Sequence, residues 1–157
     1  MALTEHPSIQ GVLTLELRDL HGALLERRRV HNLITTSGKA VLARMLGGKT
    51  NGAVQLAIGV GEEPRAPAAG DAKLGRKLTE AKAEMSEPQI AGDQVTVTVK
   101  ATVVDGGAPD KPLPLTEAGI IVRIGNDPAE LLFNRVVFPV INKGANMSLL
   151  LSWDLTF

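Results

Sequence analysis

Carboxylates are the side chains of this sequence with the widest choice of acid–base chemistry. Such chemistry needs two carboxyl groups with separated pKa values in one cleft. The candidates for such a pair are Glu62, Glu63, Glu117 and Asp154. Nothing in their spacing brings them together, so we interpret them as solvated loop charges and predict no catalytic residue among them.

The sequence also offers few side chains for metal binding or for nucleophilic catalysis. The three histidines, His6, His21 and His31, do not share the spacing of a helical or hairpin metal pair. There are no cysteines, which excludes disulfides, thiolate metal sites and cysteine nucleophiles. Serines lack the Gly-x-Ser-x-Gly elbow. We therefore expect no metal, no cofactor and no enzymatic activity.

Two short runs of residues are candidates for binding a phosphate group or a neighbouring subunit. Gly59-Val60-Gly61 follows an apolar run as a phosphate loop would, but a third glycine is missing, and we interpret it as the turn at a strand end. Arg27-Arg28-Arg29 is the sharpest charge cluster, and in a strand Arg27 and Arg29 point one way and Arg28 the other. The cluster fits either a basic stripe for an acidic neighbouring subunit or a solvated edge strand.

Composition limits the elements that could position these residues. The chain has 157 residues, enough for one domain, with 44% hydrophobic and 22% charged residues, as in a folded globule. Lys+Arg and Asp+Glu are both 17, so net charge favours neither nucleic acid nor an anionic membrane. Aromatic residues make up 3%, which disfavours glycan or base-stacking surfaces. With no basic start, no apolar leader and no membrane-spanning run, we expect a product of the cytoplasm.

Alternation of apolar and polar side chains predicts most of the strands. The clearest examples are the segments 9–18, 95–103 and 147–157. Further strands are predicted over 23–31, after the turn at 19–22, and over 54–60, 79–90, 118–124 and 130–140. One helix is predicted after the N-cap candidates Thr35 to Ser37, ending at Gly47-Gly48. One or two helical turns are also expected at 71–78.

Two proline-bearing segments are predicted as surface loops, 62–70 and 105–116. With seven or eight strands and one helix, the pattern favours a mainly β fold, a β-sandwich or jelly-roll-like pair of sheets, in a single domain over 1–157. Residues 1–8 are polar and without periodicity, which is typical of a flexible N-terminal arm.

Several blocks, in their order, resemble small structural proteins of tailed bacteriophages and related contractile particles. The blocks are Val30–Gly38, Leu56–Gly61, Leu115–Ile120, Leu132–Phe138, Lys143 and the strand that ends at Phe157. Proteins of this kind often place an acidic and a basic residue soon after the proline-containing loop, which 71–82 matches loosely. The resemblance implies a non-enzymatic virion subunit of a tail, baseplate or fibre attachment, or a capsid decoration protein.

The same resemblance implies partners and a location. We expect a homo-oligomer in a symmetric assembly that contacts other virion proteins, binds neither nucleic acid nor membrane, and resides in the virion after synthesis in the host cytoplasm. The residues predicted at subunit interfaces are Arg27, Arg29, Glu62, Glu63, Pro64, Pro109 and Pro112. Two alternatives stay open, a β-sandwich that binds a small molecule or glycan, and an enzyme whose site combines distant residues.

Overall fold

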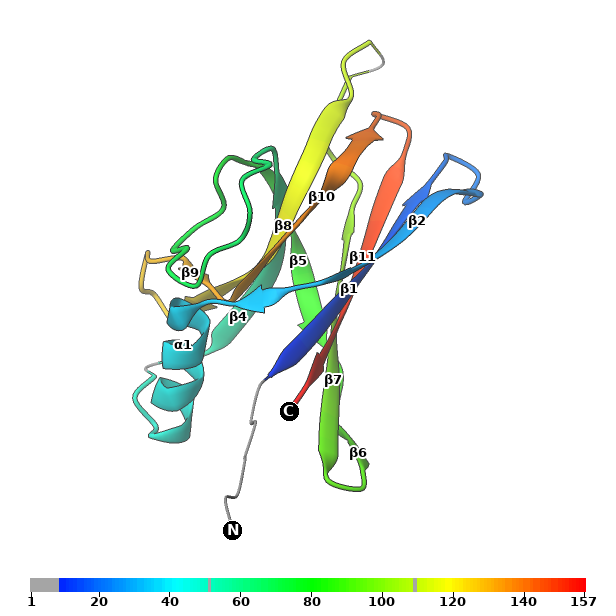
Figure 1. Ribbon diagram of the computed structural model, residues 1–157. Helices are drawn as coiled ribbons and strands as arrows, with labels where there is room; N and C mark the ends of the chain where they lie inside the picture. Colours follow the sequence, from blue (N-terminus) through cyan, green and yellow to red (C-terminus); the bar gives the residue numbers. More distant parts are fainter. Residues whose placement is uncertain (1–8, 51, 109) are drawn as a thin grey trace.

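Eleven β-strands and one helix make up the part of the chain that the computed structural model describes, residues 9–50, 52–108 and 110–157 (Figure 1). The strands are β1 (Gln10–Arg18), β2 (Leu24–His31), β3 (Leu33–Ile34), β4 (Val54–Gly61), β5 (Lys77–Met85), β6 (Gln89–Ala91), β7 (Gln94–Val103), β8 (Leu113–Ile124), β9 (Leu131–Leu132), β10 (Asn134–Lys143) and β11 (Ser148–Thr156). The helix is α1 (Thr36–Leu46). The predicted arm 1–8 and Pro109 lie outside the described residues.

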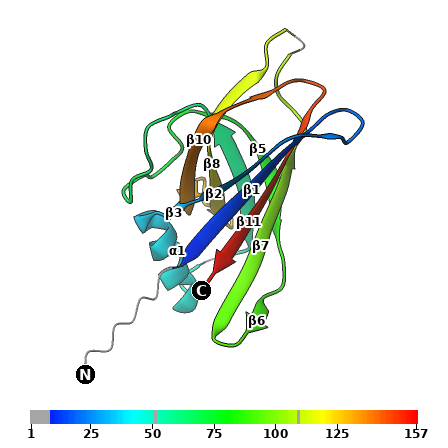
Figure 2. The same ribbon diagram turned by 45° about the vertical axis from the view of Figure 1, so that its right-hand side comes forward.

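The strands form one antiparallel sheet in the order β2-β1-β11-β7-β5-β4-β8-β10-β3, with β6 added to β7 and β9 to β8. β3 follows β2 directly in the chain but stands at the other end of this order, so the sheet rolls until its two ends meet (Figures 1 and 2). The predicted mainly β fold with one short helix is confirmed. The two facing walls of the rolled sheet correspond to the layers of a sandwich.

The predicted alternation places the core inside this roll. β1 and β11 pair with Leu13 opposite Trp153 and Leu15 opposite Leu151, and all four side chains are buried. The Trp153 indole N–H donates to Asn32 Oδ1 at 3.3 Å, at the corner where the chain passes from β2 to β3. Strands with period two thus supply one apolar face each to a shared interior.

The helix begins where its cap residues predict. Thr35 is the N-cap, and its hydroxyl accepts a hydrogen bond from the Gly38 amide at 2.9 Å. Val41 is buried against the core, and the last turn closes at Gly47, whose amide donates to the Ala43 carbonyl. The helix therefore packs one side against the sheet close to β9 (Figure 1).

Two predicted segments differ from the structure. Residues 71–76 form a loop rather than helical turns, because their polar groups bind the sheet, as described below. The second loop is shorter than predicted, since β8 begins at Leu113 and Pro114 pairs in register with Asn142. β4 stops opposite Glu117, so this start of β8 has a partner strand on one side only, where a proline is tolerated. No helix among the described residues is long and apolar enough to cross a membrane.

Candidate functional site

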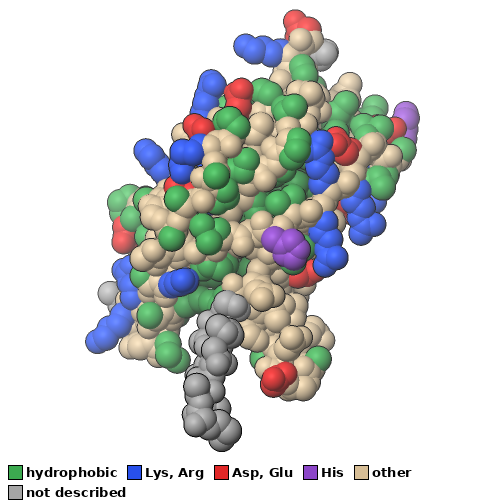
Figure 3. Space-filling view, in the orientation of Figure 1, with side chains coloured by type: hydrophobic (Ala, Val, Ile, Leu, Met, Phe, Trp, Pro, Cys, Tyr) green, Lys and Arg blue, Asp and Glu red, His purple; other side chains and the backbone are tan. Residues whose placement is uncertain are grey.

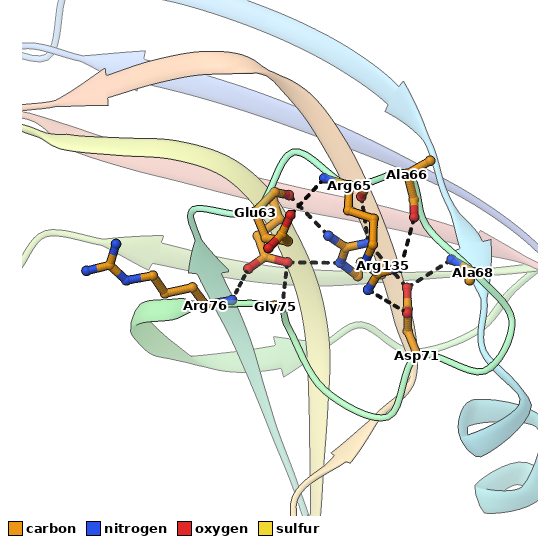
Figure 4. A network of polar contacts seen from close by, with 9 residues as sticks. Glu63, Arg65, Ala66, Ala68, Asp71, Gly75, Arg76 and Arg135 are labelled. Carbon is orange, nitrogen blue, oxygen red and sulfur yellow. Dashed lines mark hydrogen bonds and ion pairs between the residues drawn. The ribbon is translucent and has the colours of Figure 1, made fainter.

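A fully buried ion pair lies between the sheet and the loop 62–76. Glu117 of β8 and Arg135 of β10 both have 0% exposure, and Arg135 Nε donates to Glu117 Oε2 at 2.9 Å (Figure 4). β8 is buried at nearly every position from Leu115 to Ile124. Both of its faces are therefore covered. Glu117 was predicted to be a solvated loop charge, and this was wrong.

The remaining donors of Arg135 bind the loop 62–76. Its Nη1 donates to the Arg65 carbonyl at 2.9 Å and to Asp71 Oδ2 at 3.2 Å, and its Nη2 donates to the Glu63 carbonyl at 3.1 Å. A guanidinium has its donors in a rigid planar fork, so these bonds fix the loop relative to β10.

Glu117 binds the other end of the same loop. Its Oε2 accepts from the Gly75 amide at 3.0 Å and its Oε1 from the Arg76 amide at 2.8 Å. Gly61, at the end of β4, leaves room for this contact. A Cβ there would lie 2.7 Å from Glu117 Oε1 and 2.1 Å from the Arg76 carbonyl oxygen. The structure thus places Gly59-Val60-Gly61 in a strand beside a buried carboxylate, and its last glycine serves close packing.

Asp71 completes the network from within the loop. It accepts hydrogen bonds from the Ala68 amide at 2.9 Å and from Arg65 Nη2 at 2.8 Å. Burial alone would raise the pKa of Asp71, but these hydrogen bonds and the charges of Arg65 and Arg135 outweigh it, so its pKa is lowered. The carboxylate therefore stays ionised and holds the middle of the loop.

Together these contacts form what we call the loop clamp: Glu117, Arg135 and Asp71, with the loop 62–76 that they hold. A buried charge pair is tolerated only when hydrogen bonds satisfy its remaining groups. Here loop amides and carbonyls do so. The charged side chains of the loop clamp thus hold the main chain of the loop 62–76 in place.

Lys143 forms a second buried anchor at the end of β10. Its side chain has 0% exposure, and Nζ donates to the carbonyls of Val104, Gly106 and Gly144, each at 3.1 Å. Burial lowers the pKa of Lys143, and the nearby charge of Asp105 opposes that shift. The ammonium thus ties the loop 104–112 to the turn between β10 and β11.

The two anchored loops meet at a surface hollow of about 540 Å³. Its lining comprises Glu62, Arg76, Leu78, Gly107, Ala108, Lys111, Pro112, Leu113 and Pro114. Two residues predicted at interfaces, Glu62 and Pro112, are therefore brought together although 50 positions apart in sequence. Glu62 also pairs with Arg76 at 3.3 Å.

The other predicted interface residues lie elsewhere. Pro64 is exposed on the clamped loop, whereas Glu63 is half-buried and contributes its carbonyl to Arg135. Arg27 and Arg29 are exposed on β2, in register with Glu16 and Thr14 of β1, and do not line the hollow. Figure 3 shows basic side chains along the side of the molecule where β2 lies.

Metal ligands are not gathered in the described part of the chain, which holds no group of three or more His, Cys, Asp or Glu side chains suited to an ion. Comparison with known protein families, curated proteins and solved structures finds no match to this chain. The arrangement of its own residues is therefore the basis for any functional assignment.

The sequence reasoning missed Asp71, Arg135 and Lys143 as anchors. A signal was present for Arg135, which together with Asn134 stands inside the otherwise apolar segment 131–138, where a charge is costly to bury. Glu117 similarly precedes the apolar stretch that begins at Ala118.

Proposed function

We propose that this chain is a non-enzymatic structural subunit of a tailed phage or phage-like particle, in the tail, in the baseplate or on the capsid surface. It acts through contacts with copies of itself and with other particle proteins. The observation that carries this proposal is the use of the buried charges. Glu117, Arg135 and Lys143 all hold main chain of two surface loops, and these loops meet around one hollow.

Rigid loops favour association. Ordering a loop at an interface costs free energy when a complex forms, and a loop already fixed in the free protein avoids that cost. A stable interface buries about 800 Å² on each partner. The hollow and the exposed parts of both loops offer a pre-organised surface around which such an interface would form, while Arg27 and Arg29 provide a separate basic stripe for an acidic neighbour.

The decisive experiment locates the chain in particles. Antibodies raised against the purified protein are applied, with gold labels, to phage or phage-like particles made by the organism that encodes it. Label at a tail, baseplate or capsid surface is the expected result. Particles without label, in preparations whose major structural proteins are labelled by their own antibodies, overturn the proposal.

Self-association is tested in solution by native mass spectrometry. Pro64→Asp and Pro112→Asp change exposed residues of the two loops and should shift the oligomer toward monomer. Thr102→Asp introduces the same single charge at an exposed residue of β7 outside the hollow and serves as the matched control. Equal masses for all three variants and the parent would contradict a role of these loops in self-association.

A further inference from the structure

An apolar cavity of about 200 Å³ lies between α1 and the inner face of the rolled sheet, at the end where β4 begins and β11 ends (Figure 1). All the residues that line it are apolar, and they include side chains of α1 and of five strands, β4, β5, β7, β8 and β11. Val41 of α1, Val99 of β7 and Leu155 of β11 are buried, whereas Met85 and Phe157 at the margin are 56% and 46% exposed. The cavity is therefore a recess in the hydrophobic core with an apolar entrance.

Water is a poor occupant for such a space. A water molecule inside a protein needs two to four polar partners, and an apolar cavity of about 150 Å³ stays dry yet takes up benzene. Protein interiors otherwise pack as densely as organic crystals, so a recess of this size leaves its lining side chains short of dispersion contacts. An apolar molecule that enters the recess restores those contacts.

The position and the lining of the cavity both suit a small ligand. The interior of a rolled sheet, near its mouth, is a common place for a small-molecule site. Two of the four methionines of the chain, Met45 and Met85, line the cavity. Methionine is unbranched and flexible, so it adapts to apolar partners of different shape. Among the residues that the structure describes, no charged or polar side chain lines the cavity, so nothing there would bind a charged or strongly hydrogen-bonding group.

We propose that this cavity binds one neutral apolar molecule of about six to eight carbon atoms, since a somewhat smaller cavity accommodates benzene. A monocyclic aromatic compound or a short hydrocarbon chain meets this description. Its binding stabilises the fold, because a ligand that binds only the native state shifts the unfolding equilibrium toward that state. This inference does not depend on the proposed function, which rests on the two anchored loops.

Thermal unfolding with toluene is the first test. Toluene at about ten times its Kd should raise the Tm of the parent protein by about 3 to 6 °C. Phenol is the matched ligand, because a hydroxyl group replaces the methyl group of toluene and finds no partner in the lining. Titration calorimetry should give phenol a Kd about tenfold higher than that of toluene.

Two leucine variants of the same helix locate the effect. Leu42 lines the cavity, so Leu42→Trp fills part of the space and should abolish the rise of Tm with toluene. Leu46→Trp is the matched control, since Leu46 is 93% exposed and does not line the cavity. This control should keep the full rise.

Nuclear Overhauser contacts test the site in the unaltered chain, so they do not depend on how Leu42→Trp folds. The ring protons of toluene should show contacts with the methyl groups of Val41 and Val99. They should show none with the methyl groups of Val103, a buried core residue outside the cavity.

Four outcomes overturn the inference. Toluene that neither raises Tm nor contacts Val41 and Val99 removes the ligand site altogether. An equal rise of Tm in Leu42→Trp and Leu46→Trp, or an equal Kd for toluene and phenol, assigns the binding to another place. A dimer that toluene dissociates in analytical ultracentrifugation assigns the cavity to a side chain of a second copy. Contacts of both valines with a further segment of their own chain, in protein without toluene, assign the space to that segment.

Discussion

At the scale of single residues, the buried charges decide which loops of this protein are tied to the sheet. Glu117 and Arg135 lie where two strands and a loop leave no access for water, so each needs the other and the loop's main chain. Removing one partner of a buried pair leaves an uncompensated charge, which costs far more than the pair itself contributes.

Glu117→Gln should therefore lower the free energy of unfolding by about 3 to 5 kcal/mol. The amide keeps the shape of the side chain but leaves Arg135 without its closest carboxylate. Glu62→Gln is the matched control, since Glu62 is a half-exposed partner of Arg76 and should cost less than about 1 kcal/mol. Urea unfolding measures both. Equal losses would show that the Glu117–Arg135 pair does not hold the loop.

The surface cluster of Lys77, Glu80, Arg123 and Glu130 should make the stability of the fold depend on pH. Hydrogen bonds from Arg123 outweigh burial, and with the charge of Lys77 they lower the pKa of Glu80 from 4.5 to about 2. A carboxyl group whose pKa is lowered by folding stabilises the fold above its unfolded pKa, and this contribution is lost as pH falls toward the folded value.

Thermal unfolding at several pH values tests this. Glu80→Gln should lower Tm at pH 6, and the difference from the parent should shrink as pH falls from about 4.5 to about 2. Glu87→Gln, an exposed glutamate outside the cluster, controls for the lost charge. A Tm difference that stays constant over this range would contradict the assigned cause.

At the scale of elements, buried side chains hold loops whose own sequences could not order them. The loop 104–112 contains Gly106 and Gly107 with φ values of +102° and +84°, a backbone region that other residues rarely adopt. Flexible residues give this loop its path, and Lys143 fixes it from the neighbouring strand.

Lys143→Met should keep the packing of the stem but leave three part-buried carbonyls without a side-chain donor. We expect a loss of about 1 to 3 kcal/mol in the free energy of unfolding and faster amide exchange over 104–112. Lys111→Met removes an exposed lysine of the same loop and should change neither. Hydrogen exchange followed by mass spectrometry separates the two cases. Unchanged exchange in Lys143→Met would show that the loop is ordered by other contacts.

At the scale of the whole molecule, side-chain hydrogen bonds join the end of the rolled sheet at β2 to β10. Among the described residues, β2 forms a ladder with β1 only. On its other side, Arg28 is held by Glu26 and donates to the Pro139 and Val140 carbonyls of β10. Closing a sheet removes exposed edges that would otherwise pair with other chains. Arg28 thus differs in role from Arg27 and Arg29, as their opposite directions along β2 require.

Arg28→Met should weaken this contact between β2 and β10, and Arg29→Met should not. The pair is matched, because each variant removes one arginine from the same strand and only Arg28 donates to β10. We expect a loss of about 1 to 2 kcal/mol for Arg28→Met and of less than about 0.5 kcal/mol for Arg29→Met. Amide exchange in β2 should accelerate only in the first. Similar exchange in both variants would contradict closure through Arg28.

The sequence by itself determined the local elements of this protein. The alternation at 9–18, 95–103 and 147–157 predicts strands, and the Thr35 cap with Gly47-Gly48 predicts the helix, because period and capping depend on neighbours in the chain. Taken together, these predicted strands and the one helix indicate the mainly β class. The proline loops were also predicted, although β8 begins earlier than expected, at Leu113.

Only the tertiary structure decided which charges are buried. Glu117 and Arg135 stand on strands whose outward side would face solvent, had the loop 62–76 not crossed it, and Lys143 is covered at the end of its strand by the loop 104–112. Strand order and the path of a loop depend on contacts far apart in sequence, and no local pattern encodes them. For the same reason the meeting of Glu62 with Pro112, and the cavity below α1, could be found only in three dimensions.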